Sequence, residues 1–211
     1  MSYQTEQENF WAGEFGDEYL RRNDLTPSSL ASRLALWGKI LRNCPRCPSS
    51  VLELGANIGI NLHAFALLLP DASLTGLEIN SSATKALRKW GGAEVIESSL
   101  FTFSPQKKWG FVFTSGVLIH LNPDLLPTAY TLMAECSLRY ICMVEYYNPA
   151  PVTVAYRNNT EKLFKRDFAG EFLALHSEFV LRDYGFVYHK DPIFPGDDLT
   201  WFLLERDNKE L

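Results

Sequence analysis

The sequence predicts an α/β fold built on a mainly parallel sheet. Short apolar runs alternate with longer amphipathic segments from residue 50 onward, which is the pattern of successive strand–helix–strand units. Two apolar runs near the end, 181–188 and 199–204, have no helix between them, so one of these strands must run antiparallel to its neighbours. We expect a single domain over residues 1–211, with a core over residues 50–205 and an N-terminal helical cap over residues 1–49.

The cap is predicted to be helical. Residues 6–22 carry apolar side chains at broadly helical spacing, although Gly13 and Gly16 weaken the pattern. Thr26 and the serines after it are suitable capping residues for a second helix, whose apolar face extends over residues 30–41.

The core is predicted to contain seven strands with helices on both faces of the sheet. Strands are expected over residues 51–54, 73–79, 93–96, 109–114, 139–144, 181–188 and 199–204. Helices are expected over residues 61–69, 81–90, 124–136 and 169–178. The segment between the fifth strand and the last of these helices is expected to be a loop.

Composition and charge exclude several classes of function. The 20 Lys and Arg against 25 Asp and Glu give a net charge of −5, which argues against binding to nucleic acid or to an anionic membrane. No apolar run approaches the roughly 18–20 residues of a membrane span, and the polar N-terminus is not a signal peptide. We therefore expect a cytoplasmic protein, a monomer or a homodimer. Cys44 and Cys47 form a C-x-x-C, but no second such pair or pair of histidines follows it, so no metal site is predicted.

The chemistry is expected at the first strand-to-helix junction, residues 51–61. In a doubly wound sheet a nucleotide-like ligand binds outside the carboxyl end of this strand. Gly55 permits the turn and a close approach by a ligand, and Gly59 lets the following helix start close to the strand. Glu78 ends the second strand, where a carboxylate can accept both hydroxyls of an adenosine ribose.

Three cofactors could bind at such a junction: the dinucleotides NAD and FAD, and S-adenosylmethionine. The residues of the loop distinguish among them. A dinucleotide loop needs three glycines to place a pyrophosphate on the helix N-terminus, and Asn57 occupies the second of these positions. Glu53 would repel a pyrophosphate but suits a ligand that carries an ammonium and a sulfonium. The loop therefore favours S-adenosylmethionine as the cofactor.

Residues 51–61, Glu78 and the terminal strand pair resemble class I S-adenosylmethionine-dependent methyltransferases, with their Rossmann-like fold, over residues 50–205. Segments 9–23, 53–61 and 198–202 together resemble, more particularly, the methylases associated with pseudaminic acid biosynthesis. This second match covers nearly the whole chain. Asn57 departs from the class pattern, which usually has glycine there.

The class resemblance implies a map of the donor site. The methionine end of the donor would be lined by Gly55, Ala56 and Asn57, with Asn61 steadying the loop. The backbone that faces the methionine ammonium would be that of Thr114, Ser115 and Gly116.

The same resemblance places the nucleoside and a lid. Glu78 would hold the ribose and Ile79 would cover the adenine, whose amino group would meet the segment that contains Ser99 and Leu100. The lid would bring Trp11 and Tyr19 near the donor and offer Arg22 to its carboxylate. Alternatively, the two aromatic side chains only pack in the core between the helices, and Arg22 is a solvated surface charge.

Two residues are candidates for catalysis. His120 follows the fourth strand, and its unperturbed pKa of about 6.5 suits a base near neutral pH. Glu145 follows the fifth strand and could anchor an amine or guanidine, with the rings of Tyr146 and Tyr147 walling a cation. The alternative for His120 is a ring that packs over the cofactor without taking part in chemistry. The alternative for Glu145 and its tyrosines is a loop that shields the site.

The acceptor is expected to be a small molecule, a hydroxyl or amine of a sugar or nucleotide-activated sugar of the pseudaminic-acid type. Arg157, Lys165 or Arg166 would then be the partner for its phosphate or carboxylate. Methylation of the nitrogen of an amine or guanidine metabolite is the alternative, and a non-catalytic donor-binding regulator on the same fold is another.

Overall fold

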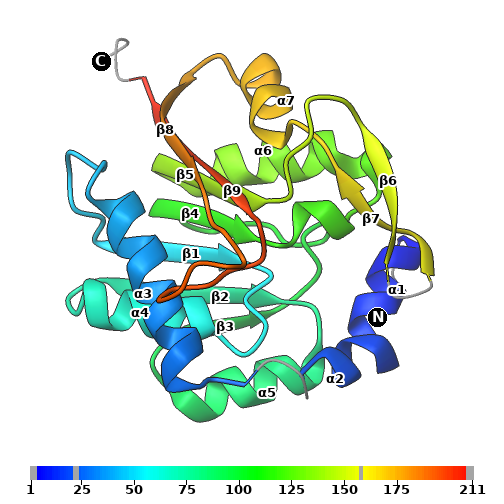
Figure 1. Ribbon diagram of the computed structural model, residues 1–211, viewed down its shortest axis with the longest axis horizontal. Coiled ribbons are helices and arrows are strands. Elements are labelled where there is room, and N and C mark those ends of the chain that lie inside the picture. The colour runs from blue at the N-terminus through cyan, green and yellow to red at the C-terminus, as the bar shows by residue number, and fades with distance from the viewer. Residues whose placement is uncertain (1–3, 21–23, 157–158, 208–211) are drawn as a thin grey trace. The chain divides into compact units, whose positions relative to one another are not determined.

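The computed structural model describes residues 4–20, 24–156 and 159–207 (Figure 1). Two compact units account for the chain. The first contains Met1–Ser104 with Pro192–Phe194, and the second contains Pro105–Asp191 with Pro195–Leu211.

The first unit contains the predicted cap and the first three strands. Its elements are α1 (Glu6–Ala12), α2 (Glu14–Leu20), α3 (Pro27–Leu41), β1 (Ser50–Leu54), α4 (Ile60–Leu68), β2 (Ser73–Glu78), α5 (Ser81–Trp90) and β3 (Glu94–Glu97). β2 pairs in parallel with both β1 and β3. The side chains of Val51, Leu52 and Leu54 are fully buried, as expected for a strand covered on both faces.

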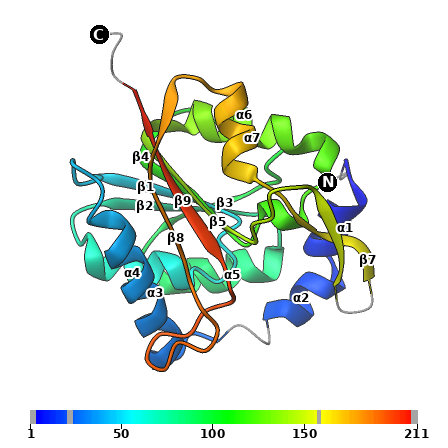
Figure 2. The same cartoon turned by 45° about the horizontal axis from the view of Figure 1, so that its top comes forward.

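The second unit contains β4 (Trp109–Ser115), the short 3₁₀ turns η1 (Leu118–His120) and η2 (Pro123–Leu125), α6 (Leu126–Cys136), β5 (Ser137–Glu145), β6 (Val152–Tyr156), β7 (Asn159–Lys165), α7 (Phe168–Leu175), β8 (Phe179–Phe186) and β9 (Thr200–Arg206). β4 and β5 are parallel. β9 lies between β5 and β8 and is antiparallel to both (Figure 2).

The strand order confirms the predicted fold class. The seven-stranded sheet has the order β3-β2-β1-β4-β5-β9-β8, and β9 is its one antiparallel strand among the described residues. This is the Rossmann-like arrangement of mainly parallel strands with flanking helices.

The cap departs from the expected helix over residues 6–22. Gly13 adopts an extended conformation and divides this region into α1 and α2, and its N–H donates to the Asn9 carbonyl at 3.1 Å. Thr5 and Glu8 form a capping box at the start of α1. The prediction for Thr26 is confirmed, because its hydroxyl accepts from the Ser29 N–H at the start of α3.

The expected loop between β5 and α7 is wrong in part, because β6 and β7 form an antiparallel hairpin there. Val154 lies opposite Leu163, and Thr153 lies opposite Phe164. The β-branched residues of β6 favour a strand, but a five-residue strand gives too few repeats for a clear period in the sequence.

Candidate active site

The loop between β1 and α4 is built from residues in the left-handed backbone region. Gly55, Asn57 and Gly59 have φ angles of 77°, 50° and 81°. The N–H groups of Gly55 and Ala56 donate to the Leu77 carbonyl at 2.8 and 3.0 Å, which ties the loop to β2. Asparagine is one of the few residues that tolerate the left-handed region, so Asn57 can replace the usual glycine without changing the path of the loop.

Gly59 is favoured by its left-handed backbone and by a side chain that lies close to its Cα. It is the N-cap of α4, and a Cβ atom at this position would collide with the Leu87 side chain of α5. The close approach that glycine permits is therefore one between neighbouring helices, in addition to its positive φ.

Glu78 is held at the end of β2 by backbone N–H groups of Asn57, Ile79 and Asn80. Asn57 N donates to Oε2 at 2.7 Å, and Asn80 N donates to Oε1 at 2.8 Å. Burial raises the pKa of Glu78, while these hydrogen bonds lower it. The Ile79 N–H also hydrogen-bonds to this carboxylate, so three of its roughly four acceptor positions are engaged by the backbone and at least one is left for a ribose hydroxyl. Ile79, next in the chain, is half-buried.

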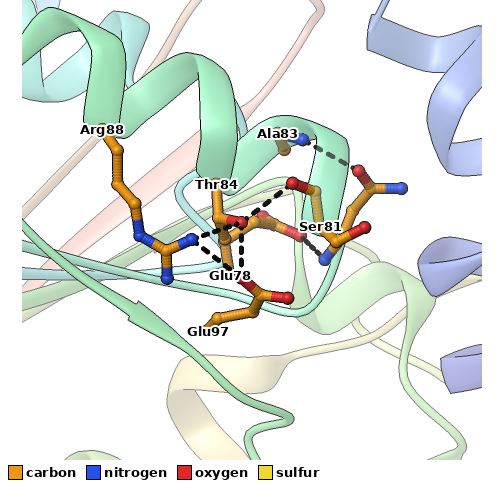
Figure 3. Close-up of polar contacts among 7 residues, drawn as sticks. Glu78, Ser81, Ala83, Thr84, Arg88 and Glu97 are labelled. Atoms are coloured by element: carbon orange, nitrogen blue, oxygen red, sulfur yellow. Dashed lines mark hydrogen bonds and ion pairs between the residues drawn. The ribbon is translucent and has the colours of Figure 1, made fainter.

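The helix after Glu78 is anchored at both ends, as Figure 3 shows. The Ala83 N–H donates to the Asn80 side chain at 2.9 Å and closes the N-terminus of α5. Glu97, at the end of β3, accepts from Thr84 and from Arg88, each at 2.9 Å. These contacts fix the ends of β2 and β3 on α5.

A buried chain of hydrogen bonds runs beneath the loop. Trp37 Nε1 donates to Asn61 Oδ1 at 3.0 Å, and Asn61 Nδ2 donates to Glu53 Oε1 at 2.6 Å. Asn61 therefore joins α3, α4 and β1 beneath the loop. Glu53 Oε2 is buried with no hydrogen-bond partner among the described residues, and burial raises the pKa of Glu53 to about 8.

Ser99 lies after β3, as predicted, but its hydroxyl has a protein partner. It donates to the Glu8 carboxylate on α1 and accepts from Phe101 N at 3.0 Å. Leu100 beside it is half-buried. Sequence reasoning missed Glu8, although the Thr5–Glu8 capping-box pattern marks it as an ordered carboxylate.

The aromatic residues of the cap pack against one another. Trp11 makes edge-on contacts with Phe15 and with Tyr19, at ring-centroid distances of 5.4 and 5.2 Å. Trp11 and Tyr19 are each half-buried. This packing is what the helix-core alternative predicts, so the contacts by themselves do not assign either ring to a ligand. Arg22 lies outside the described residues.

In the second unit, the turn after β4 has the expected backbone. Thr114 is fully buried and Ser115 is half-buried. Gly116 has a φ of 67°, and its N–H donates to the Val144 carbonyl at 2.9 Å. A Cβ atom on Gly116 would meet no atom within 4 Å, so the space beside this backbone is open.

Glu145 is engaged by the backbone that follows β4. Its carboxylate accepts from the N–H groups of Val117, Leu118 and Ile119 at 3.1, 3.2 and 3.4 Å. Burial raises the pKa of Glu145 to about 7 against the lowering effect of these bonds. The geometry makes Glu145 a support for η1, whereas the sequence suggested a group directed at the acceptor.

His120, at the end of η1, is buried against the hairpin. Its Nδ1 lies 2.6 Å from the Lys162 carbonyl oxygen on β7. A carbonyl oxygen can only accept, so Nδ1 carries the proton and Nε2 has the lone pair. Burial lowers the pKa of His120 to about 4. The assumption of an unperturbed pKa was therefore wrong, because the sequence does not reveal how deeply the ring is buried.

The charged and aromatic residues proposed for the acceptor already have partners. Arg166 Nε lies 2.7 Å from the Glu171 carboxylate, which also accepts from the Tyr130 hydroxyl. Lys165 Nζ lies 4.9 Å from the centre of the Tyr146 ring. Tyr147 packs against Phe202 at 5.8 Å. Arg157 lies outside the described residues.

The described residues contain neither a metal-binding cluster nor a membrane-spanning helix. No group of three or more His, Cys, Asp or Glu side chains there is arranged to hold a metal ion. No helix among them is long and apolar enough to cross a membrane.

Comparison with solved structures identifies the fold. A 1,6-didemethyltoxoflavin N1-methyltransferase from Burkholderia thailandensis superposes with a TM-score of 0.70 at 15% identity, over 98% of this chain and 91% of that one. An amino pentose methyltransferase of calicheamicin biosynthesis from Micromonospora echinaspora gives 0.65 at 13% identity, over 91% and 96%. Coclaurine N-methyltransferase gives a TM-score of 0.62 at 12% identity. The superposition includes 76% of this chain but only 52% of that one.

All three structures contain S-adenosylmethionine or S-adenosylhomocysteine. No family model matches this sequence. No curated protein matches it either. At identities this low the likeness shows the fold, and function has to be argued from the site.

Proposed function

We propose that this protein is an S-adenosylmethionine-dependent methyltransferase that acts on a small molecule. The contact between Asn57 N and the Glu78 carboxylate carries the proposal, because it joins the glycine-rich loop to the acidic residue at the end of β2. This is the arrangement that a Rossmann-like fold uses to bind a nucleoside. The small-molecule methyltransferases that share the fold support the same conclusion.

The chemistry of the residues fits this donor. Glu78 ends β2 as an ordered carboxylate that can accept from a ribose hydroxyl, and Glu53 has a buried oxygen without a partner that would attract the ammonium. In the second unit, Gly116 leaves open space beside its backbone. When bound, S-adenosylmethionine supplies an electrophilic methyl group. The chain's own residues would bind and orient the two reactants, which is the main source of rate in a displacement at carbon.

His120 is the proposed proton acceptor on the acceptor side. The Lys162 carbonyl fixes the tautomer, which places the lone pair of the neutral ring on Nε2. A base with a pKa of about 4 removes little of the cost of ionising a hydroxyl. A neutral amine already has its lone pair, so the lowered pKa favours nitrogen as the methylated atom.

Calorimetry with S-adenosylhomocysteine tests donor binding. We expect binding in the micromolar range, and Glu78→Ala should weaken it at least about tenfold because a charge-assisted hydrogen bond to the ribose is lost. Glu94→Ala, at an exposed carboxylate on neighbouring β3, is the matched control and should bind normally. Absence of heat with folded protein and either form of the donor would rule out the proposal.

For the acceptor, we propose an amine or hydroxyl of a sugar or nucleotide-activated sugar of the pseudaminic-acid type. An amine or guanidine metabolite is the second candidate, and the lowered pKa of His120 supports it. A screen of metabolite extracts with methyl-labelled donor distinguishes them by the labelled product. Donor binding without a labelled product in any extract would instead support a non-catalytic, donor-binding regulator.

A further inference from the structure

Asn80, two residues after β2, forms hydrogen bonds through its backbone N–H and through both polar atoms of its side chain. Its N–H donates to Glu78 Oε1 at 2.8 Å, and its Oδ1 accepts from the Ala83 N–H at 2.9 Å. Its Nδ2 donates to the Trp11 carbonyl at 3.2 Å and to the Asp17 carboxylate at 3.1 Å. The side chain is 4% exposed. One residue therefore links Glu78, the start of α5 and the α1–α2 pair.

Gly16 explains why α2 can reach Asn80. It is buried, and a Cβ atom at this position would lie 2.7 Å from Asn80 Nδ2 and would collide with the Trp11 carbonyl oxygen. Any larger residue would therefore displace the two hydrogen bonds that Asn80 donates. The glycine that weakens the helical pattern in the sequence is the one that the contact requires.

A second anchor lies after β3. The Ser99 hydroxyl donates to Glu8, and the same carboxylate accepts from Gln4 N and Thr5 N at 2.8 and 2.9 Å. Glu8 is 6% exposed and is fixed by these backbone contacts. The α1–α2 pair is thus fastened at two points, which follow two successive strands.

We propose that Asn80 and Ser99 are positioning residues that hold the α1–α2 pair on the ends of β2 and β3. Because Asn80 also binds Glu78, docking of this pair and binding of a ligand at Glu78 stabilise each other. The coupling rests on the proposed function, since it needs a ligand at Glu78. The docking itself does not, so the two can be tested separately.

Amide hydrogen exchange of the free protein, read by mass spectrometry over residues 6–20, tests docking without any donor. Asn80→Asp keeps the Oδ1 that caps α5 but replaces the donor with a carboxylate oxygen that faces Asp17 and the Trp11 carbonyl. We expect exchange in residues 6–20 to be about tenfold faster, with the β4 and β5 peptides unchanged. Unchanged exchange in residues 6–20 would overturn the proposal.

A swapped pair provides the specific control. In Asn80→Asp/Asp17→Asn the amide group lies on α2 and can donate to the new carboxylate, so part of the protection should return. Asp17→Asn alone should have a small effect, because Asn80 can still donate to an amide oxygen. Glu18→Gln, at an exposed position of the same helix, should have none. Equal exchange in the swapped pair and in Asn80→Asp would contradict the assigned contact.

The remaining outcomes are also decisive. If Asn80→Asp accelerates exchange throughout the chain, Ser99→Ala replaces it. Faster exchange confined to α1 then supports the two-anchor docking, and unchanged exchange overturns it.

With S-adenosylhomocysteine present, residues 6–20 should be further protected in the unaltered protein and less so in Asn80→Asp. Binding without added protection would refute the coupling, whereas absence of binding would refute the proposed function and leave the docking result standing.

Discussion

Glu53 leads to a quantitative prediction about protons. With a pKa of about 8, close to nine-tenths of the Glu53 carboxyls are protonated at pH 7 in the free protein. An ammonium beside the unpartnered oxygen would favour the carboxylate and restore a pKa nearer the ordinary value. Donor binding at pH 7 should therefore release about 0.9 proton, on the same linkage argument. The affinity should rise almost tenfold between pH 6 and pH 7, and the rise should end near pH 8, where the donor's own ammonium begins to lose its proton.

Titration calorimetry in buffers with different ionisation enthalpies measures this release directly. The range from pH 6 to pH 7 is suitable because an α-amino group, with a pKa near 7.7–8.0, stays protonated there. Glu53→Gln is the matched variant, since its amide imitates the protonated acid and can still accept from Asn61. It should bind the donor with no proton release and without the rise in affinity.

The same pKa has a consequence for stability that needs no ligand. The folded protein binds more protons than the unfolded chain between the ordinary pKa of 4.5 and about 8. The free energy of unfolding should therefore fall as the pH rises through this window, and the fall should be smaller in Glu53→Gln, which keeps the contributions of Glu78 and Glu145. Urea unfolding at pH 5 and pH 8 measures it. An identical pH dependence in the two proteins, or donor binding without proton release, would refute the reasoning.

Three further predictions concern single side chains. His120→Asn can keep a donor to the Lys162 carbonyl but lacks Nε2, so kcat should fall about tenfold, as for the loss of one hydrogen bond, with little change in Tm, whereas unchanged kcat would exclude a proton-accepting role. Asn57→Ala should lower the free energy of unfolding by roughly 1–2 kcal/mol and Asn57→Gly by less, measured by urea unfolding, because only alanine is strained at this positive φ. Arg166→Met should cost roughly 1 kcal/mol of stability through the lost Glu171 pair and leave the KM for the acceptor unchanged; a raised KM would restore Arg166 as an acceptor ligand.

The parts of the fold that the sequence predicts are those with local signals. The order of strands and helices follows from apolar runs and caps, and the position of Glu78 follows from the end of an apolar strand. Thr26 shows the same principle, because a capping residue acts within one turn of its own helix. The hairpin of β6 and β7 was missed because its signal is short and its pairing partner is not local.

The candidate site was harder to predict because its residues act through partners that are distant in sequence. The sequence shows that Glu145 follows a strand, but it does not show that the carboxylate accepts from the backbone of residues 117–119. Ser99 has the expected position, yet its hydroxyl donates to a side chain 91 residues away. Residue type and strand position therefore predict where a group lies, and the hydrogen-bond partners decide what it can do.

These partners change the expectation for the methyl acceptor. Arg166 is neutralised by Glu171, and the positive charge of Lys165 lies over the Tyr146 ring. An anionic acceptor would have to displace these contacts, so part of any attraction would be spent in breaking them. The His120 ring is neutral at physiological pH and offers a hydrogen-bond acceptor rather than a charge. The described acceptor side therefore favours a nucleophile that is uncharged at the reacting atom, which a neutral amine satisfies more readily than an ionised hydroxyl.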